Sequence, residues 1–247
     1  MKFRFSLMTL NLWYTIKLDE RRPVIEEFFR IHRPDILCIQ EIREDTIKIL
    51  DDLLEDYTRV HDDCPSWSNE SNIYYKRELF EEVKHDRVDL NMPEKERGLF
   101  YIVLKSSYSN KTLFISTAHL THQGNADECR TGMNYRHSEA IVISESLKTL
   151  VGKNQPALIC GDFNDPFHPY RIIKEKLGWI EVFQYLKLEA PITFPCTQNS
   201  DEIFIVESID KIITNDEMIP VMASSPRITG HVGLSDHYPV EAMFEIK

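Results

Sequence analysis

The stretch Leu158-Ile159-Cys160-Gly161-Asp162-Phe163-Asn164 decides the fold. Its first three residues are apolar, and a glycine and two polar residues follow close behind them. A short apolar run bounded by turn residues is typical of a strand that is buried on both faces. The pattern therefore predicts a core strand that delivers polar side chains at its end.

The same pattern returns along the chain. Apolar runs over residues 7–10, 36–39 and 113–118 lead into polar residues, and further polar residues flank the apolar runs near the C-terminus. Strands that end at one side of a sheet can bring such residues to one pocket. The residues at these positions are Asn11, Glu41, His119, Asp162, Asn164, Asp210, Asp236 and His237.

Strand-like runs alternate with helical patterns, which indicates an α/β protein. No linker rich in proline, glycine or serine and no repeat interrupts the sequence, so we expect a single domain over residues 1–247. Many strands and few long helices favour two packed sheets with helices on the outer faces. Strands are expected over residues 3–12, 35–40, 72–75, 99–104, 112–118, 157–160, 209–214 and 238–246, helices over 23–31, 45–54 and 135–151, and loops over 91–97 and 121–134.

The composition is that of an ordinary globular protein, with 42% hydrophobic and 28% charged residues. The net charge of -11 makes the chain as a whole repel phosphate polymers, which argues against nonspecific wrapping of nucleic acid. A bound cation dominates its local field, so a polyanionic substrate remains compatible with this charge. The charge therefore restricts the mode of binding and leaves the substrate class open.

The five cysteines include no CxxC pair, which argues against a disulfide scaffold or a zinc ribbon. The N-terminal residues lack the apolar stretch of a signal peptide, and no run approaches the length of a membrane span. We therefore expect an intracellular, soluble protein of the cytoplasm or nucleus. It is expected to be a monomer without stable membrane association.

The polar residues at the strand ends fit the chemistry of phosphoester hydrolysis. Carboxylate and amide oxygens are the ligands that Mg²⁺ prefers, and they are supplied by Asn11, Glu41, Asp162, Asn164 and Asp236. The reaction also needs a group that orients water and a donor beside the phosphoryl oxygens. His237 with Asp210 and His119 complete that set. Taken singly, each residue could also serve a turn or a helix end, so the hypothesis depends on the whole set.

Six motifs in this order resemble those of the endonuclease/exonuclease/phosphatase superfamily and span nearly the whole chain. The Gly-Asp-Phe-Asn motif and the Ser-Asp-His-Tyr-Pro motif near the C-terminus are the most specific, whereas Gln-Glu alone is weak evidence. The motifs are Thr9-Leu10-Asn11-Leu12-Trp13, Gln40-Glu41, Thr117-Ala118-His119-Leu120, Gly161-Asp162-Phe163-Asn164, Ile209-Asp210 and Ser235-Asp236-His237-Tyr238-Pro239.

The resemblance implies a two-sheet α/β sandwich with the site at one edge, and it implies roles for the individual residues. Glu41 would hold a catalytic Mg²⁺ or Mn²⁺ with help from Asn11, and Asp236 would be a further metal or water contact. Asp162 and Asn164 would orient the attacking water and the phosphate. Asp210 would pair with His237, and His119 would stabilise the transition state.

His119 also bears on the branch of the superfamily that the chain resembles. Apurinic endonucleases usually place a tyrosine near this point, whereas the deoxyribonuclease-like branches place a histidine. Abasic-site repair is therefore disfavoured. Glu139 departs from the pattern, because many relatives of this type carry glutamine there.

Three further residues are candidate substrate contacts. Arg136 and Arg97 flank predicted loops and could clamp phosphate, although either could also be a structural charge. Asn72 begins a predicted strand where relatives often carry a small or polar residue near the metal. Trp13 and Tyr14 follow Asn11, where an aromatic ring could be core or could stack on a base.

The leading hypothesis is a divalent-metal-dependent hydrolase that cleaves phosphodiester bonds by in-line attack of water. A nucleic acid or nucleotide is the favoured substrate, and the charge favours short or single-stranded forms. The alternative within enzymes is a phosphatase or lipid phosphodiesterase of the inositol phosphate or sphingomyelin type. The alternative of another class is a catalytically silent binding module.

Overall fold

The computed structural model describes residues 3–109, 111–198, 207–228 and 230–247, and the strands of these residues form two six-stranded sheets. The first sheet has the strand order β11-β12-β1-β2-β4-β3. Its strands are β1 (Arg4–Asn11), β2 (Ile36–Gln40), β3 (Tyr57–Arg59), β4 (Ser71–Lys76), β11 (Met218–Ser224) and β12 (Val240–Ile246).

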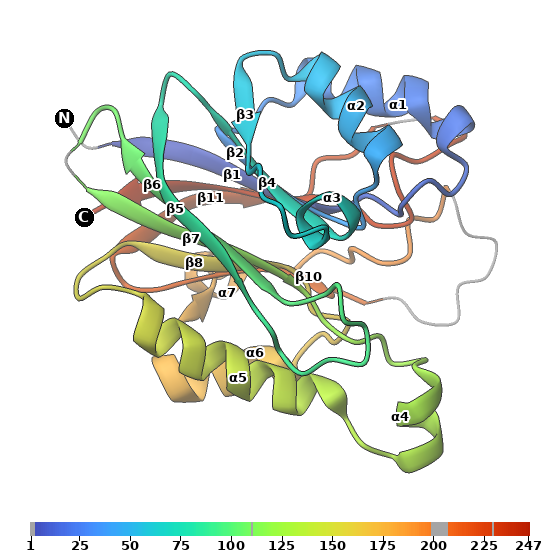
Figure 1. Ribbon diagram of the computed structural model, residues 1–247. Helices are drawn as coiled ribbons and strands as arrows, with labels where there is room; N and C mark the ends of the chain where they lie inside the picture. The colour runs from blue at the N-terminus through green and yellow to red at the C-terminus, as the bar shows by residue number, and fades with distance from the viewer. Residues whose placement is uncertain (1–2, 110, 199–206, 229) are drawn as a thin grey trace.

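The second sheet has the strand order β5-β6-β7-β8-β10-β9. Its strands are β5 (Phe80–Val88), β6 (Leu99–Ser106), β7 (Thr112–His119), β8 (Ala157–Asp162), β9 (Ile180–Glu181) and β10 (Asp210–Thr214). The two sheets lie face to face (Figure 1). Each contains one parallel pair, β1 with β2 and β7 with β8, among antiparallel neighbours.

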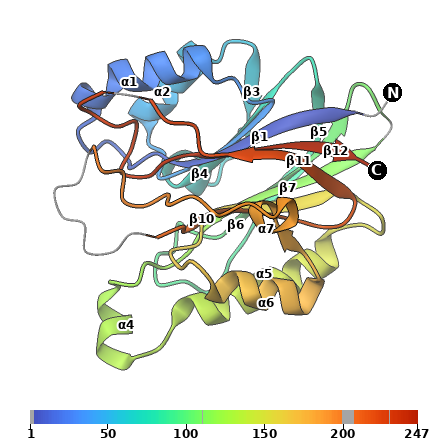
Figure 2. The same cartoon turned by 180° about the vertical axis from the view of Figure 1, so that it is seen from behind.

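Helices cover the outer faces of both sheets, as the views from the front and from behind show (Figures 1 and 2). Helices α1 (Leu18–Ile31) and α2 (Glu44–Leu53) lie on the first sheet, and α5 (Tyr135–Leu150) and α6 (His168–Leu177) lie on the second. The short helices α3 (Ser66–Asn69), α4 (Ala126–Thr131) and α7 (Val182–Leu186) lie in connections. The expected two-sheet α/β sandwich with outer helices is confirmed.

The apolar residues form three layers because successive side chains of a strand point to opposite faces. In β1, Phe5 and Leu7 belong to the core between the sheets, whereas Met8 and Leu10 pack against the helices of the first sheet. A third cluster joins α5 and α6 to the second sheet. The continuous apolar run of β2 follows from this arrangement, because both of its faces are buried.

The face of each central strand that points between the sheets changes from apolar to polar toward one end. In β1 this face carries Phe5 and Leu7, and then the buried polar residues Thr9 and Asn11. Gln40 of β2 hydrogen-bonds Thr9 at 3.1 Å and Thr117 of β7 at 2.8 Å. A layer of buried hydrogen bonds thus connects the two sheets directly beneath their polar ends.

Some elements differ from the sequence-based expectations. Helix α1 begins at Leu18, five residues earlier than expected, because Pro23 lies inside the helix rather than at its start. The expected loop over residues 121–134 contains α4, which Asn125 caps through its side chain. Strand β5 was not expected, because its sequence FEEVKHDRV is mostly polar, as an exposed edge strand permits.

The cysteines and the lengths of the helices can also be compared with the sequence-based expectations. All five cysteines are free thiols. Within the described ranges, no helix combines the length and the apolar character that crossing a bilayer requires.

Candidate active site

The polar ends of the central strands meet at one edge of the sandwich. Asn11 ends β1, and Glu41 follows β2, its parallel neighbour. In the second sheet His119 of β7 lies beside Asp162 of β8, and Asp210 of β10 lies opposite Asp162. The two sheets therefore bring residues from distant parts of the sequence to one place.

Gly161 allows β7 and β8 to approach each other at this edge. Its φ is +130°, and a Cβ added there would lie 2.0 Å from the carbonyl oxygen of Ala118. No other residue type could occupy this position without moving the strands apart. The glycine of the Gly-Asp-Phe-Asn motif therefore fixes the register that sets His119 beside Asp162.

Asp162 lies at the centre of the site and is 1% exposed. Its Oδ2 accepts a hydrogen bond from Nδ2 of Asn11 at 3.1 Å and lies 3.5 Å from Nε2 of His119 and 3.7 Å from Nε2 of His237. Its Oδ1 accepts the backbone N–H of Asn164 at 2.8 Å. Burial alone would raise the pKa of Asp162, but the two histidines outweigh burial and lower it.

His237 donates from Nδ1 to Oδ2 of Asp210 at 2.8 Å, which turns its Nε2 toward Asp162. Burial would lower the pKa of His237, yet the carboxylates of Asp210 and Asp162 outweigh burial and raise the pKa well above its usual value. The ring of Phe194 packs at 4.8 Å from the imidazole. His237 is thus a buried imidazole held between two carboxylates that favour its protonated form.

Glu70 completes a second pair of the same kind, and sequence reasoning missed it. Its Oε1 accepts a hydrogen bond from Nδ1 of His119 at 2.8 Å, and its carboxylate is almost fully buried. Burial would raise the pKa of Glu70, but the bond from His119 and the charges of Arg97 and Arg43 lower it. Only the pairing of β2 with β4 reveals this residue, because Gln40 lies opposite Ser71 and so places Glu70 next to Glu41.

Glu41 and Asp236 lie on the more open side of the site. Glu41 reaches within 3.8 Å of Nε2 of His119, and Asn11 hydrogen-bonds it. Burial raises the pKa of both Glu41 and Asp236, and a neighbouring carboxylate raises each further, Asp236 for Glu41 and Asp162 for Asp236. Glu41 and Asn164 also adopt left-handed backbone conformations, with φ values of 56° and 48°. Such a conformation is strained for glutamate, whereas asparagine tolerates it, and strained residues are common at functional sites.

The donor set fits an oxygen-preferring divalent cation. Ligand atoms of Asp162, Asp210 and His237 lie within 4.8 Å of one another, and Glu41 and Asp236 add two more carboxylates. Oδ1 of Asp210 is buried, and none of the described residues provides it with a hydrogen-bond partner. Several carboxylates that face one another at this depth repel one another unless a cation lies between them.

Arg21 holds the backbone segments beside the site in place, and sequence reasoning missed this residue as well. Its fully buried guanidinium donates to five backbone carbonyls, which include those of Leu12 at 3.0 Å and Leu234 at 2.9 Å. Burial lowers the pKa of Arg21 to about 10. One side chain therefore joins the segment after Asn11 to the segment before Asp236.

The structure corrects the expectation for Asn72. Its side chain is fully buried, and its amide hydrogen-bonds only backbone atoms, donating to Val60 and Trp67 and accepting from Val60 and Ile73. No polar atom of Asn72 is left to contact a substrate. The residue instead holds the segment before β4, which carries Glu70.

Arg97 and Arg136 also differ from their expected role as phosphate clamps. Both are buried, and both donate to carbonyls of the loop after His119, Arg97 to Leu120 at 3.0 Å and Arg136 to Thr121 at 2.6 Å. Glu139 accepts two hydrogen bonds from Thr121 in the same loop. The geometry therefore favours a role in positioning the His119 loop for all three residues.

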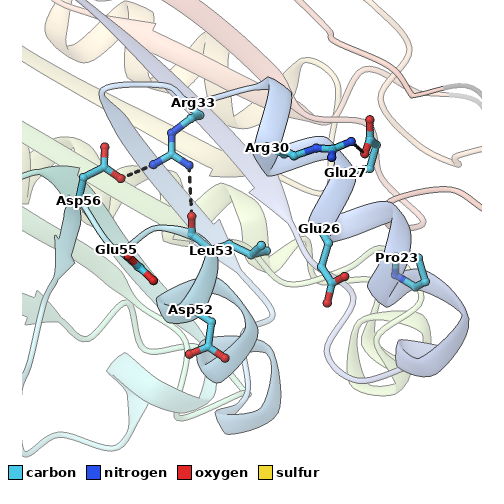
Figure 3. Close-up of a pocket in the computed structure, with 9 residues that line it drawn as sticks. All are labelled: Pro23, Glu26, Glu27, Arg30, Arg33, Asp52, Leu53, Glu55 and Asp56. Atoms are coloured by element: carbon cyan, nitrogen blue, oxygen red, sulfur yellow. Dashed lines mark hydrogen bonds and ion pairs between the residues drawn. The ribbon is translucent and has the colours of Figure 1, made fainter.

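A hollow of about 680 Å³ between α1 and α2 does not coincide with the site (Figure 3). Its lining is mostly charged, and Figure 3 shows that these side chains pair with one another, Arg33 with Asp56 and Arg30 with Glu27. None of the site residues named above lines it. The site is accordingly defined by its converging polar groups.

Solved structures with the same fold cover nearly the whole chain. D. rerio TDP2 complexed with single strand DNA product matches with a TM-score of 0.80 and 17% identity, over 98% of each chain. The human Nocturnin catalytic domain with bound sulfate matches with a TM-score of 0.78 and 17% sequence identity, over 100% of this chain and 97% of that one. The Bacteroides thetaiotaomicron mannosyl-6-phosphatase Bt3783 matches with a TM-score of 0.74 and 19% sequence identity, over 96% of this chain and 98% of that one.

The sequence itself matches no curated protein. It does match the model of the endonuclease/exonuclease/phosphatase family over residues 8–237. That range begins in β1 and ends at His237, so it contains every site residue discussed above. Together with the shared fold, this match supports a phosphoester hydrolase. The chain belongs to the endonuclease/exonuclease/phosphatase family.

Proposed function

We propose that the protein is a divalent-metal-dependent hydrolase that cleaves phosphodiester bonds by in-line attack of water. The observation that carries this proposal is the position of Asp162, whose Oδ2 faces the Nε2 atoms of His119 and His237 at 3.5 and 3.7 Å. Each histidine has its own buried carboxylate on the far nitrogen. A phosphoryl group bound over this centre would meet an anion that orients water and donors that stabilise its oxygens.

Glu41, Asn11 and Asp236 are the residues that would hold Mg²⁺ or Mn²⁺. When bound, the metal neutralises charge that develops on the phosphoryl oxygens. Asp162 keeps its charge at neutral pH because its pKa is lowered, and together with Asn164 it would orient the attacking water. His237 retains its proton because its pKa is raised, so it would donate to a phosphoryl oxygen while Asp210 holds the ring in place. His119 would stabilise the transition state from the other side, held by Glu70.

A nucleic acid or nucleotide is the substrate that the rim of the site favours. Trp13 and Tyr14 follow Asn11, and both are partly exposed and have left-handed φ values. Arg43 stacks on Tyr14 at 4.0 Å, and Lys17 lies 5.9 Å from the ring of Trp13. Aromatic rings beside cations can bind bases and phosphates together. The DNA product in the TDP2 structure agrees with this substrate class.

The proposal is tested by hydrolysis of bis(4-nitrophenyl) phosphate and 4-nitrophenyl phosphate with Mg²⁺, with Mn²⁺ and with EDTA. We expect the diester to be cleaved with either metal and not with EDTA, and a Glu41→Ala variant to lose both metal binding and turnover. Absence of turnover of either ester, with metal binding unchanged in Glu41→Ala, would indicate a binding module.

A substrate panel under one metal condition then tests the substrate class. It contains single-stranded DNA, RNA, nucleotides, inositol phosphates, sphingomyelin and mannose 6-phosphate. We expect the highest kcat/KM for a nucleic acid or nucleotide. A preference for a monoester such as mannose 6-phosphate would instead indicate a phosphatase, for which the Bacteroides structure is the precedent.

A further inference from the structure

Two histidines outside the active site meet at the ends of two packed helices. Nδ1 of His137, near the start of α5, lies 2.8 Å from Nε2 of His168, the first residue of α6. Their ring centroids are 5.1 Å apart, and the ring planes are tilted by 31°. The two residues are 31 positions apart in sequence, so only the packing of α5 on α6 brings them together.

The backbones that carry the two imidazoles are held independently of the imidazoles. The N–H of His137 donates to Oδ1 of Asn134 at 3.2 Å, and the N–H of His168 donates to Oδ1 of Asp165 at 2.7 Å. Nε of Arg136 lies 3.9 Å from Oδ2 of Asp165, which adds a second connection between the two helix starts. The two rings are thus presented by rigid helix ends, as a preorganised ligand pair requires.

We propose that His137 and His168 form a binding site for a late first-row divalent cation of the Zn²⁺ type, with water completing the coordination. Imidazole nitrogen suits Zn²⁺, Cu²⁺ and Ni²⁺, whereas Mg²⁺ prefers oxygen, so this pair and the carboxylate-rich active site select different metals. His137 is exposed and His168 is half-buried, so a cation reaches the pair without unfolding.

The two nitrogens hydrogen-bond each other, so cation binding would release the proton between them and move them slightly apart. Two nitrogens bound to Zn²⁺ in tetrahedral geometry, with bonds of about 2.05 Å, lie about 3.4 Å apart, slightly more than the present separation of the two nitrogens. Rotation of the exposed His137 side chain provides that difference. The positive ends of α5 and α6 act against a cation, but the carboxylate of Asp165 at the start of α6 opposes them.

A cation at this site would join the start of α6 to the start of α5. Asn164 lies only four residues before His168, so the same cation would also restrain the connection that carries this active-site residue. Binding to the folded state alone raises the melting temperature, which gives a second readout.

The experiment is a calorimetric titration of Zn²⁺ into the full chain in excess Mg²⁺, which competes for the oxygen-rich site. We expect one Zn²⁺ to bind to the wild type, with affinity reduced at least tenfold in His137→Gln and in His168→Gln. His61→Gln, at an exposed histidine before α3, is the matched control and should bind as the wild type does. Zn²⁺ should raise the melting temperature of the wild type and of His61→Gln, but not that of the two pair variants.

Electron paramagnetic resonance of Cu²⁺ bound to the wild type provides a measurement without any variant. Coupling of the copper to two imidazole nitrogens is the expected result. Unchanged Zn²⁺ isotherms in both pair variants, or a Cu²⁺ spectrum with fewer than two coupled nitrogens, would overturn the proposal. Neither readout depends on catalysis, so its outcome is independent of the proposed hydrolase activity.

Discussion

Glu70 accepts a hydrogen bond of 2.8 Å from His119, and this pair mirrors Asp210 and His237 on the other side of Asp162. Each carboxylate binds the Nδ1 of its histidine and so directs Nε2 toward the same oxygen of Asp162. The relationship makes Glu70 a positioning residue for His119, although no apolar run precedes it in the sequence.

Glu70→Gln is expected to lower kcat by about 10- to 100-fold with little change in KM, because a neutral amide holds the imidazole of His119 less firmly than the carboxylate does. The measurement is steady-state kinetics with a phosphodiester, which separates the effect on kcat from the effect on KM. Glu82→Gln is the matched control, since Glu82 accepts a hydrogen bond of 2.5 Å from His85 outside the site. Wild-type kinetics in Glu70→Gln would contradict the assigned role.

Asp162→Asn and His237→Ala should each reduce turnover by about a thousandfold or more while the fold remains intact, because in the proposed mechanism Asp162 orients the attacking water and His237 donates to a phosphoryl oxygen. Residues that act as a unit are non-additive, so the double variant should lose little more than either single one. Circular dichroism checks the fold, and Asp216→Asn at an exposed position is the control. Near-native turnover in either single variant would refute the role assignments.

Gly161→Ala is expected to destabilise the protein by about 2–4 kcal/mol, because its Cβ would clash with the carbonyl of Ala118 and its backbone would be strained. Gly178→Ala is the matched control. Gly178 also has a positive φ, but nothing lies within 4 Å of the added Cβ, so a cost of only about 1 kcal/mol is expected. Urea denaturation measures both, and equal costs would show that the close approach of β7 and β8 is unimportant.

Glu139→Gln tests a pH-dependent contribution to stability. Burial raises the pKa of Glu139 above its unfolded value of about 4.3. The contribution of Glu139 to the free energy of unfolding is therefore complete below that pH, and it is lost as the pH rises through the pKa of the folded state. Glutamine keeps partners for both groups of Thr121 but does not ionise. The variant should therefore gain stability relative to the wild type between pH 5 and 8.

Urea denaturation at several pH values measures this gain. Glu145→Gln lies on the same helix at an exposed position and should follow the wild type at every pH. A stability difference between Glu139→Gln and the wild type that stays constant with pH would refute a buried, ionising carboxyl group.

Much of the fold and the position of the site could be predicted because buried strands leave a clear pattern in the sequence. The apolar run of β2 and the glycine after Cys160 indicated core strands, and the polar residues after such runs meet at one edge. Strand β5 could not be predicted, because an exposed edge strand does not need apolar residues on both faces.

The supporting residues of the site could not be predicted from local patterns. Glu70 reaches His119 only because β4 pairs with β2, and Arg21 reaches Leu234 across most of the chain. The same limitation explains why the role of Asn72 was predicted incorrectly. Its position at a strand start suggested a substrate contact, but its hydrogen-bond partners are backbone atoms. Such roles depend on pairings between distant segments, which the local pattern does not contain.

The two guanidinium bonds from Arg21 to Leu12 and Leu234 also determine when the protein becomes competent during synthesis. Asn11 leaves the ribosome more than two hundred residues before Asp236 and His237, and β12 must then insert beside β1. A nascent chain therefore holds an incomplete site until residues 236–246 have been made and β12 has paired with β1.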